Sequence, residues 1–282
     1  MVKTKIASPT GILQDYIHSF ELREVDTFNE VMKKPCHGSH EVLISLIIGS
    51  NRPMFKPISK HISGFNCDDV KPLFSGVIGV QSNMKGFFIF QGRYKIFTIQ
   101  FQPIGFSSIF QIPVNTITDQ FFDAKDLFHL EFEDLHEQLH ENITFQKMVI
   151  LTQNFLERKL ASNQTLWKSE AIRKASNSLI YEPNAYSMEQ LAFHSNMSLK
   201  TFERKFIEIV GIRPKLYTRI RRFNQALKLK QYHTELNWLD VCVETGYFDL
   251  NHLNKDFKAL AGNPPASFFK NTPPPDEDFS HL

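Results

Sequence analysis

The stretch Gly246-Tyr-Phe-Asp-Leu-Asn-His-Leu-Asn-Lys-Asp-Phe-Lys258 decides the fold of the second half of this chain, because it belongs to a unit that occurs twice. The spacing Phe202-x3-Phe206-x4-Gly211-x2-Pro214-x2-Tyr217 recurs 51 residues later as Leu253-x3-Phe257-x4-Gly262-x2-Pro265-x2-Phe268. Apolar residues at this spacing form one face of a helix. The glycine that follows is suited to end the helix, and a proline comes shortly after it. The sequence therefore predicts an internal repeat of two helical units.

A shorter helical segment precedes each of these two helices, at residues 187–194 and 237–246. In the first segment, Ser187 and Gln190 have the spacing of a capping box. Three residues link each segment to a good N-cap residue, Ser198 or Asp249. A short helix, a tight turn and a capped second helix form the helix-turn-helix pattern, which this sequence predicts twice.

The outward faces of the two capped helices carry side chains that can read bases. Arginine and lysine donate to guanine, asparagine pairs with adenine, and glutamate accepts from cytosine. Helix faces in contact with solvent are commonly polar as well, so a merely solvated face is the alternative for each residue. At 100° per residue, the outward positions are Lys200, Glu203 and Arg204 in the first unit and Asn251, Asn254 and Lys255 in the second.

Charge is distributed unevenly along a chain whose net charge is only +2. Residues 1–160 hold 16 basic and 17 acidic residues, whereas residues 168–270 hold 16 basic and 10 acidic residues. Residues 213–230 alone carry seven positive charges and no acid. Such a run suits a polyanion such as nucleic acid, and a solvated helix face is the alternative that charge alone leaves open.

The second half resembles the C-terminal DNA-binding domain of AraC/XylS-type bacterial transcription regulators. The resemblance rests on the stretch 246–258 with its continuation to Phe268, and on the first unit from Ser198 to Pro214. It covers about residues 170–271. It implies an all-α domain in which one long helix, starting near Pro214, joins two helix-turn-helix units. Their recognition helices then enter successive major-groove turns, about 34 Å apart on one face of the DNA.

By position, the resemblance also assigns roles to individual residues. Leu250 departs from the polar residue often found there, and an apolar contact with a thymine methyl group is the expectation for it. The residues that correspond to base-contacting positions are Lys200, Glu203, Arg204, Leu250, Asn251, Asn254 and Lys255. Phosphate contacts, which set the salt dependence of binding, fall to Lys205, Arg221 and Arg222.

The first half reads as mostly β. Apolar runs at residues 41–48, 86–90 and 94–101 are separated by glycines and prolines. The run 101–110, with the short motifs at 118–120 and 123–127, resembles the N-terminal sensory domain of one AraC-type subgroup. That resemblance covers about residues 10–130 and implies a cupin-like β-barrel followed by helices, with an effector-binding and dimerising role. The phenylalanine-rich strands either form core or line an apolar effector pocket.

Four segments follow from these patterns. They are a β-rich effector-binding domain at 1–130, a helical linker at 131–168, the double helix-turn-helix domain at 169–271 and a disordered acidic tail at 272–282. Within the linker, helical spacing over residues 145–160 predicts an amphipathic helix. Its apolar face either packs within the chain, which is the default, or pairs with a second chain in a homodimer.

Cys36-His-Gly-Ser-His40 invites a metal interpretation, with His61 and Cys67 as further donors. These residues lie in an expected loop, and polar loop residues are the preferred interpretation. A Cys36/His37 nucleophile pair is less favoured, because adjacent side chains seldom face each other. Three cysteines form no disulfide framework, and the sequence lacks the phosphate-binding, dinucleotide-binding and nucleophile-elbow motifs. We therefore expect no catalytic residues, no metal and no cofactor.

The sequence thus predicts a two-domain, sequence-specific DNA-binding transcription regulator, modulated by a small-molecule effector in its first half. The alternative is a cupin-type metal-dependent enzyme with an appended helix-turn-helix domain. Family analogy adds RNA polymerase as a partner. The chain begins without the pattern of a secretory signal, and its longest apolar run, at 42–48, is far shorter than the roughly 20 residues of a membrane span. A cytoplasmic location is the expectation.

Overall fold

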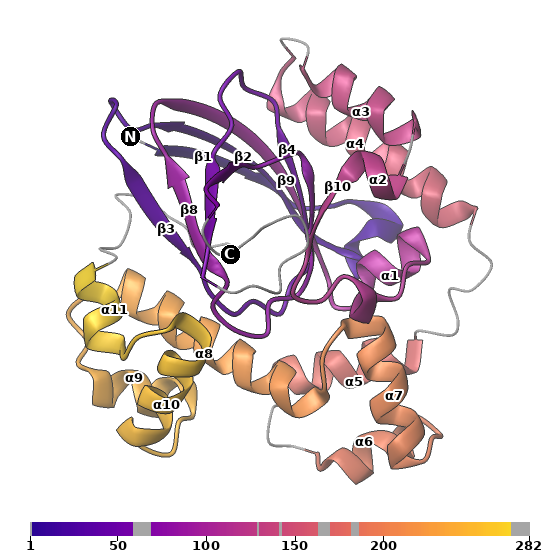
Figure 1. The fold of residues 1–282 in the computed structure, drawn as a ribbon. Coiled ribbons are helices and arrows are strands. Elements are labelled where there is room, and N and C mark those ends of the chain that lie inside the picture. Colours follow the sequence, from indigo (N-terminus) through magenta and orange to yellow (C-terminus); the bar gives the residue numbers. More distant parts are fainter. Residues whose placement is uncertain are drawn as a thin grey trace.

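The computed structural model describes residues 2–58, 69–128, 130–140, 143–162, 170–181 and 186–271. A β-rich half lies above a row of helices, and the long helix α8 runs beneath the strands (Figure 1). The proposed acidic tail at 272–282 lies outside the described residues, as do His61 and Cys67. The predicted fold class, a β-rich first half followed by an all-α part with two helix-turn-helix units, is confirmed.

The β-rich half contains two antiparallel sheets that face each other as a flattened barrel (Figure 1). The six-stranded sheet has the order β1 (Val2–Ala7), β2 (Ile17–Asp26), β9 (Arg93–Phe101), β4 (Leu43–Ile47), β7 (Gly76–Ile78), β10 (Phe121–Asp123). The four-stranded sheet has the order β3 (Met32–Cys36), β8 (Gly86–Phe90), β5 (Met54–Pro57), β6 (Lys71–Pro72). The strands expected at 41–48, 86–90 and 94–101 are therefore present, as β4, β8 and β9.

Helices cover the outer face of the six-stranded sheet (Figure 1). Phe20 and Phe97 stack on that face, and Phe97 makes an edge contact with Phe145 of α4. Because alternate residues of a strand point to opposite faces, this layer takes up much of the aromatic content of β2 and β9. The phenylalanines Phe20, Phe97 and Phe101 of these two strands belong to the buried core. The elements of this region are η1 (Gly11–Asp15), α1 (Gly105–Phe110), η2 (Val114–Thr116), α2 (Ala124–Phe128), α3 (Leu130–His140) and α4 (Phe145–Ala161).

The opposite face of the same sheet carries a buried polar network. Glu21 pairs with Arg23 at 2.7 Å and accepts a hydrogen bond from the Gln100 amide at 2.6 Å, and Ser19 lies beside both. Burial raises the pKa of Glu21, although Arg23 acts against this. The interior side of the six-stranded sheet is thus polar where its helix-facing side is aromatic.

Helix α4 confirms the amphipathic pattern predicted for residues 145–160. Its apolar side, from Phe145 through Met148 and Leu156 to Leu160, is buried within the chain against η1, α1 and α3. Of the two possibilities left open by the sequence, packing within the chain is the one observed. That face is therefore not available for pairing with a second copy.

The all-α part is built around the 19-residue helix α8 (Pro214–Tyr232), which begins at the expected proline. On one side of it lie α5 (Glu170–Tyr181), α6 (Met188–His194) and α7 (Leu199–Val210), and on the other lie α9 (Trp238–Thr245), α10 (Leu250–Ala261) and α11 (Pro265–Asn271). A single buried apolar cluster extends from the six-stranded sheet through α4 into these helices. The two halves therefore share a core.

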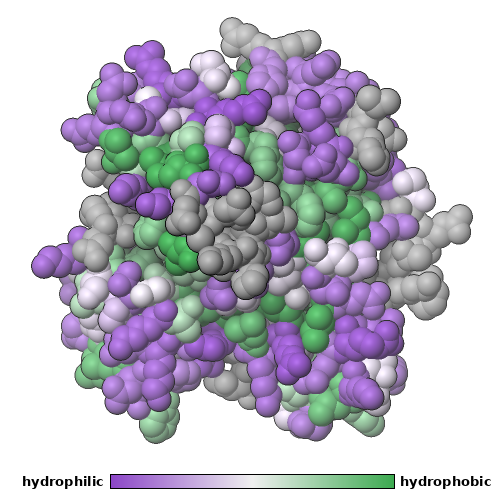
Figure 2. All heavy atoms as spheres, viewed as in Figure 1, coloured by the Kyte–Doolittle hydropathy of each residue, from purple (hydrophilic) through white to green (hydrophobic). Residues whose placement is uncertain are grey.

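The surface seen in Figure 2 is dominated by hydrophilic residues, and its apolar patches are small and separated. Within the described ranges, no helix has both the length and the apolar character needed to cross a membrane.

Candidate nucleic-acid interface

Both predicted helix-turn-helix units form, and each is closed by the local interactions that its sequence implies. In the first unit, Ser187 and Gln190 make the reciprocal bonds of a capping box at the start of α6. Ser198 caps α7 by accepting from the backbone of Thr201 at 3.3 Å. Gly211 then ends α7 in the left-handed conformation, with φ at 95°. The helix boundaries that the sequence predicts for this unit are the boundaries found in the structure.

The second unit repeats this construction with one addition that sequence reasoning missed. Asn237 and Asp240 form a second capping box at the start of α9. The signal was present, because asparagine followed three residues later by an acid has the same spacing as Ser187 and Gln190. Asp249 caps α10 by accepting from the His252 backbone at 2.7 Å. The offset of 51 residues is therefore a true structural repeat.

The predicted base-reading residues lie on the accessible sides of α7 and α10. Phe202, Phe206 and Val210 of α7 are buried, as are Leu253, Phe257 and Leu260 of α10. On the other sides, Lys200, Arg204, Leu250, Asn251 and Lys255 are exposed, and Glu203 and Asn254 are partly exposed. The structure thus brings each predicted set together on one helix.

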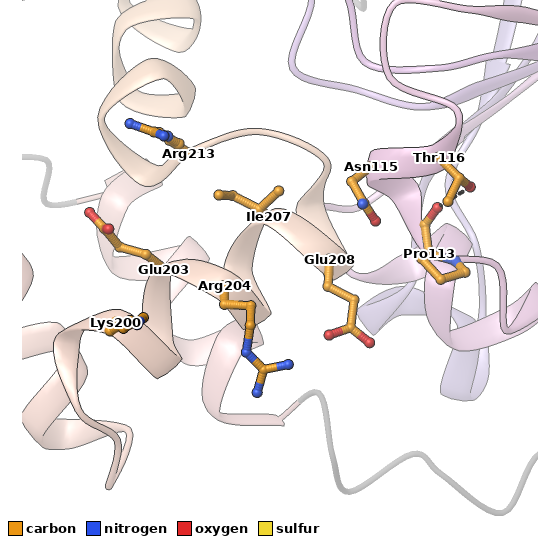
Figure 3. A pocket seen from close by; sticks show the side chains of 9 residues that line it. All are labelled: Pro113, Asn115, Thr116, Lys200, Glu203, Arg204, Ile207, Glu208 and Arg213. Atoms are coloured by element: carbon orange, nitrogen blue, oxygen red, sulfur yellow. Dashed lines mark hydrogen bonds between the residues drawn. The ribbon is translucent and has the colours of Figure 1, made fainter.

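The accessible face of α7 borders a shallow groove that reaches the β-rich half. Figure 3 shows Lys200, Glu203 and Arg204 along α7, with Asn115 and Thr116 of η2 on the far side of the groove. Both η2 residues are exposed. The groove has a volume of about 560 Å³ and is open to solvent. The first half of the chain therefore flanks the face that the sequence assigned to base reading.

A buried carboxylate anchors α10 to α8, which the sequence analysis did not anticipate. Asp256 is 2% exposed, and it accepts from Arg219 Nε at 2.5 Å and from the Tyr247 hydroxyl at 3.2 Å. An acid beside Phe257 on the buried side of α10 was the available signal. This network fixes the second recognition helix relative to the helix that joins the two units.

The positive run at 213–230 divides between several environments. Arg219 binds Asp256, and Lys230 donates to the carbonyl groups of Thr234 and Leu236. Arg222 lies over the Tyr247 ring at 5.4 Å. Arg221 lines a groove between the two halves, with Glu41 and His40. The phosphate contact expected for Arg221 stays a prediction.

The segment around Cys36, which the sequence offered as a possible metal or nucleophile site, has neither a reactive thiol nor a set of metal ligands among the described residues. Burial raises the pKa of the Cys36 thiol to about 12, which keeps it in the unreactive neutral form. His37 bonds the Gly38 carbonyl through Nδ1 and lies against Phe223. Among the residues that the structure describes, no group of three or more His, Cys, Asp or Glu side chains is placed to hold a metal ion.

Comparison with known proteins gives a family match in the part of the chain that contains the two helix-turn-helix units. Residues 191–271 match the family model described as "Helix-turn-helix domain". No curated protein sequence matches the chain.

Among solved structures, ToxT from Vibrio cholerae O395 is similar, with 10% identity and a TM-score of 0.47 over 96% of this chain and 98% of that one. ToxT bound to (E)-4-(8-methylnaphthalen-1-yl)but-3-enoic acid has the same identity of 10% and TM-score of 0.47, and the match covers 95% of this chain and 98% of that one. Unsaturated fatty acid bound wild-type ToxT from Vibrio cholerae strain SCE256 also has 10% identity and a TM-score of 0.47, and the match covers 89% of this chain and 95% of that one. The matched residues contain helix α7, the long helix α8 and the second capped unit, so this part of the chain is a helix-turn-helix domain.

Proposed function

We propose that this protein is a sequence-specific transcription regulator that reads two adjacent major-groove segments of DNA. One observation carries the proposal. The two units present side chains with base-pairing chemistry on the accessible faces of two equivalent helices, α7 and α10. Recognition helices contact base edges mainly with their N-terminal residues, and these side chains lie in the first two turns.

Within this proposal, Arg204 and Lys200 donate to guanine, and Glu203 accepts from cytosine. On α10, Asn251 and Asn254 pair with adenine, Lys255 donates to guanine and Leu250 contacts a thymine methyl group. Leu250 is 40% exposed, which supports such an apolar contact. Lys205, Arg221 and Arg222 hold phosphates.

We assign the β-rich half the binding of a small-molecule effector, following the resemblance to AraC-type sensory domains. The shared core and the direct contacts between the halves support this assignment. For example, Asp15 of η1 pairs with Arg173 of α5 at 3.1 Å. A ligand that changes the packing of the first half therefore has a mechanical route to the recognition helices. Further proposals by family analogy are a cytoplasmic location, contact with RNA polymerase, and a homodimer that does not use the buried face of α4.

The test is selection of genomic DNA fragments by the full-length protein at two salt concentrations, with competitor DNA present. We expect an enriched motif with two blocks about one helical turn apart. Binding that enriches no motif and disappears as salt rises would reduce the interface to a nonspecific basic surface. A motif with a single block would mean that only one of the two units reads bases.

A further inference from the structure

Helix α3 carries two histidines one turn apart at its C-terminal end. Residues 136–140 read His-Glu-Gln-Leu-His, and His140 is the last residue of the helix. Side chains four positions apart lie on the same face of a helix, and zinc hydrolases place two of their metal ligands at this spacing. The expectation of no metal did not take this pentapeptide into account.

The two imidazole rings meet through the nitrogens that can bind a metal. His136 Nε2 lies 3.2 Å from His140 Nε2, and the ring centroids are 4.6 Å apart. Zinc binds an imidazole nitrogen at about 2.0–2.1 Å, so two such nitrogens in a tetrahedral site lie about 3.3–3.4 Å from each other. The separation in this protein is therefore close to the one that a single shared ion requires.

Two oxygen atoms of the six-stranded sheet converge on the same nitrogen. Ser75 Oγ lies 3.1 Å from His136 Nε2, and the Ile47 carbonyl oxygen lies 3.3 Å from it. A neutral imidazole nitrogen offers one proton or one lone pair, so it cannot satisfy His140 and both oxygens with full hydrogen bonds. Ile47 ends β4 and Ser75 directly precedes β7. The cluster thus gathers more polar atoms than one ring nitrogen can serve.

The surroundings of the pair suit a cation that enters from solvent. Residues 130–140 hold four acidic residues and no lysine or arginine. The C-terminal end of a helix carries partial negative charge. Burial lowers the pKa of His136, and His140, Lys125 and Arg52 add to this, so the His136 ring is neutral at pH 7, the form that binds metals. His136 is partly exposed and His140 is exposed.

We propose that His136 and His140 bind one divalent transition-metal ion of the zinc type. The Ser75 hydroxyl and water occupy the remaining positions. Among the described residues, no third His, Cys, Asp or Glu side chain is placed to join them. Zinc hydrolases use three protein ligands, so the inference concerns binding and includes no hydrolysis.

A bound ion would join α3 to the sheet that it covers, because its ligands come from the helix and from the segment before β7. None of these residues belongs to the C-terminal helices, and α3 lies far from α7 and α10 (Figure 1). The inference therefore goes beyond the regulator proposal, and its test does not depend on DNA binding. An ion that binds only the folded chain stabilises it in proportion to the logarithm of the metal concentration.

The experiment is calorimetric titration and thermal unfolding of the full-length protein, free of any histidine tag and stripped of metal with EDTA. Zn²⁺ and Ni²⁺ are the probes, since imidazole suits both ions, and Mg²⁺ and Ca²⁺, which prefer oxygen ligands, are the comparators. We expect one zinc or nickel ion per chain and an unfolding temperature that rises with metal concentration and falls again on addition of EDTA. The comparators should have no such effect.

Three variants decide whether the ion is bound at this pair. His140→Ala should weaken zinc binding by about tenfold or more, because one of two nitrogen ligands is lost. The side chain is exposed, so the metal-free protein should unfold at nearly the same temperature as the wild type. Ser75→Ala should weaken zinc binding less. His194→Ala is the matched control, because His194 is also an exposed histidine at the last position of a helix, and it should leave zinc binding unchanged.

Absence of saturable zinc and nickel binding would overturn the inference and leave the two rings as a hydrogen-bonded pair. Equal binding of Mg²⁺ would do so as well, since it would indicate attraction to the acidic helix alone. An affinity for zinc that His140→Ala leaves unchanged, or that His194→Ala lowers equally, would show that the ion is bound elsewhere on the chain.

Discussion

Basic side chains of this protein lie in different environments, some exposed to solvent and others bound to groups within the protein. Lys200, Arg204 and Lys255 project from the recognition helices into solvent. Arg219, by contrast, is committed to the buried Asp256, and Lys230 caps the carbonyl groups of the turn after α8. Arg219 and Lys230 belong to one positive run, and charge pattern alone did not predict that they bind groups within the protein. What distinguishes them is the residue that the fold places opposite each one.

Base reading and phosphate binding can be separated with two neighbouring residues of α7. Arg204→Ala should cost about 1–3 kcal/mol for the selected site and relax the preference at one base pair. Lys205→Ala should weaken specific and random DNA alike and reduce the salt dependence of binding. Dissociation constants measured for both DNAs at two salt concentrations provide the test. Equal losses on both DNAs for the two variants would contradict the division of roles.

The carboxyl group of Glu41 should make stability depend on pH. Its pKa in the folded protein is raised to about 7, chiefly by burial and by Glu21, while Lys228 and Arg221 act against this. A raised carboxyl pKa means that the folded state binds a proton the unfolded state has released. The stability contributed by Glu41 is therefore full below about pH 4.5 and declines as the pH rises to about 7.

Replacement of Glu41 by glutamine removes this decline. Relative to the wild type, Glu41→Gln should therefore gain about 2–4 °C in unfolding temperature on going from pH 5 to pH 8, after allowance for solvent screening in the groove. Thermal unfolding at the two pH values checks this. His40, whose pKa is lowered to about 3, titrates in the opposite sense but is common to both proteins, so it cancels in the comparison.

Local sequence accounts for nearly the whole construction of the helix-turn-helix elements. Caps at Ser187, Ser198, Asn237 and Asp249 accept hydrogen bonds from backbone groups two or three residues away. Glycines at the ends of α7, α9 and α10 adopt positive φ. Each of these features depends only on a short span of the chain, which is why the repeat predicted most of them, although the equally local capping box at Asn237 was missed.

Stability and DNA binding should separate between two residues at the start of α10. Asp249→Ala removes the N-cap and should cost about 1 kcal/mol of stability. Asn251→Ala leaves the cap in place and should scarcely change the unfolding temperature, because its side chain is exposed. It should instead weaken binding to the selected DNA by about 1–3 kcal/mol. Thermal unfolding and DNA titration of both variants provide the test: Asp249→Ala should lose stability, and Asn251→Ala should lose DNA affinity.

For the molecule as a whole, the decisive feature is that the β-rich half contacts both recognition helices near their C-terminal ends. Gly211 lies against Val114 and Thr118, and Leu260 lies against Gly38. The aromatic side of the six-stranded sheet, helix α4 and the C-terminal helices also belong to one buried cluster. The helix-turn-helix part therefore packs directly on the first half and is not joined to it by a linker alone.

Two glycines with positive φ provide a matched test of this contact. At Gly246, φ is 70° and a side chain would meet nothing within 4 Å, so Gly246→Ala should cost only the conformational strain of about 1–2 kcal/mol. At Gly211, φ is 95°, and an added Cβ would lie 2.6 Å from Thr118 Oγ1 and 2.8 Å from Val114 Cγ1. Gly211→Ala should therefore cost about 1–3 kcal/mol more, through overpacking.

The readout is the unfolding temperature of the full-length variants together with their affinity for the selected DNA. Gly211→Ala should lower both more than Gly246→Ala does, because it disturbs the contact between the halves. If the two substitutions had equal effects, the packing of η2 on α7 would contribute nothing to the protein in solution.

The sequence by itself determined the two helix-turn-helix units, their caps, the long helix from Pro214, the main strands and the outward faces of α7 and α10. These follow from periodicity and from backbone bonds within a few residues, which any chain segment carries with it. Only the tertiary structure decided that Arg219 serves Asp256, that Arg221 faces Glu41, and that Tyr217 and Asn224 border a cavity. Those environments are created by residues some 40 to 180 positions away in the chain, and no local pattern encodes which side chain will meet them.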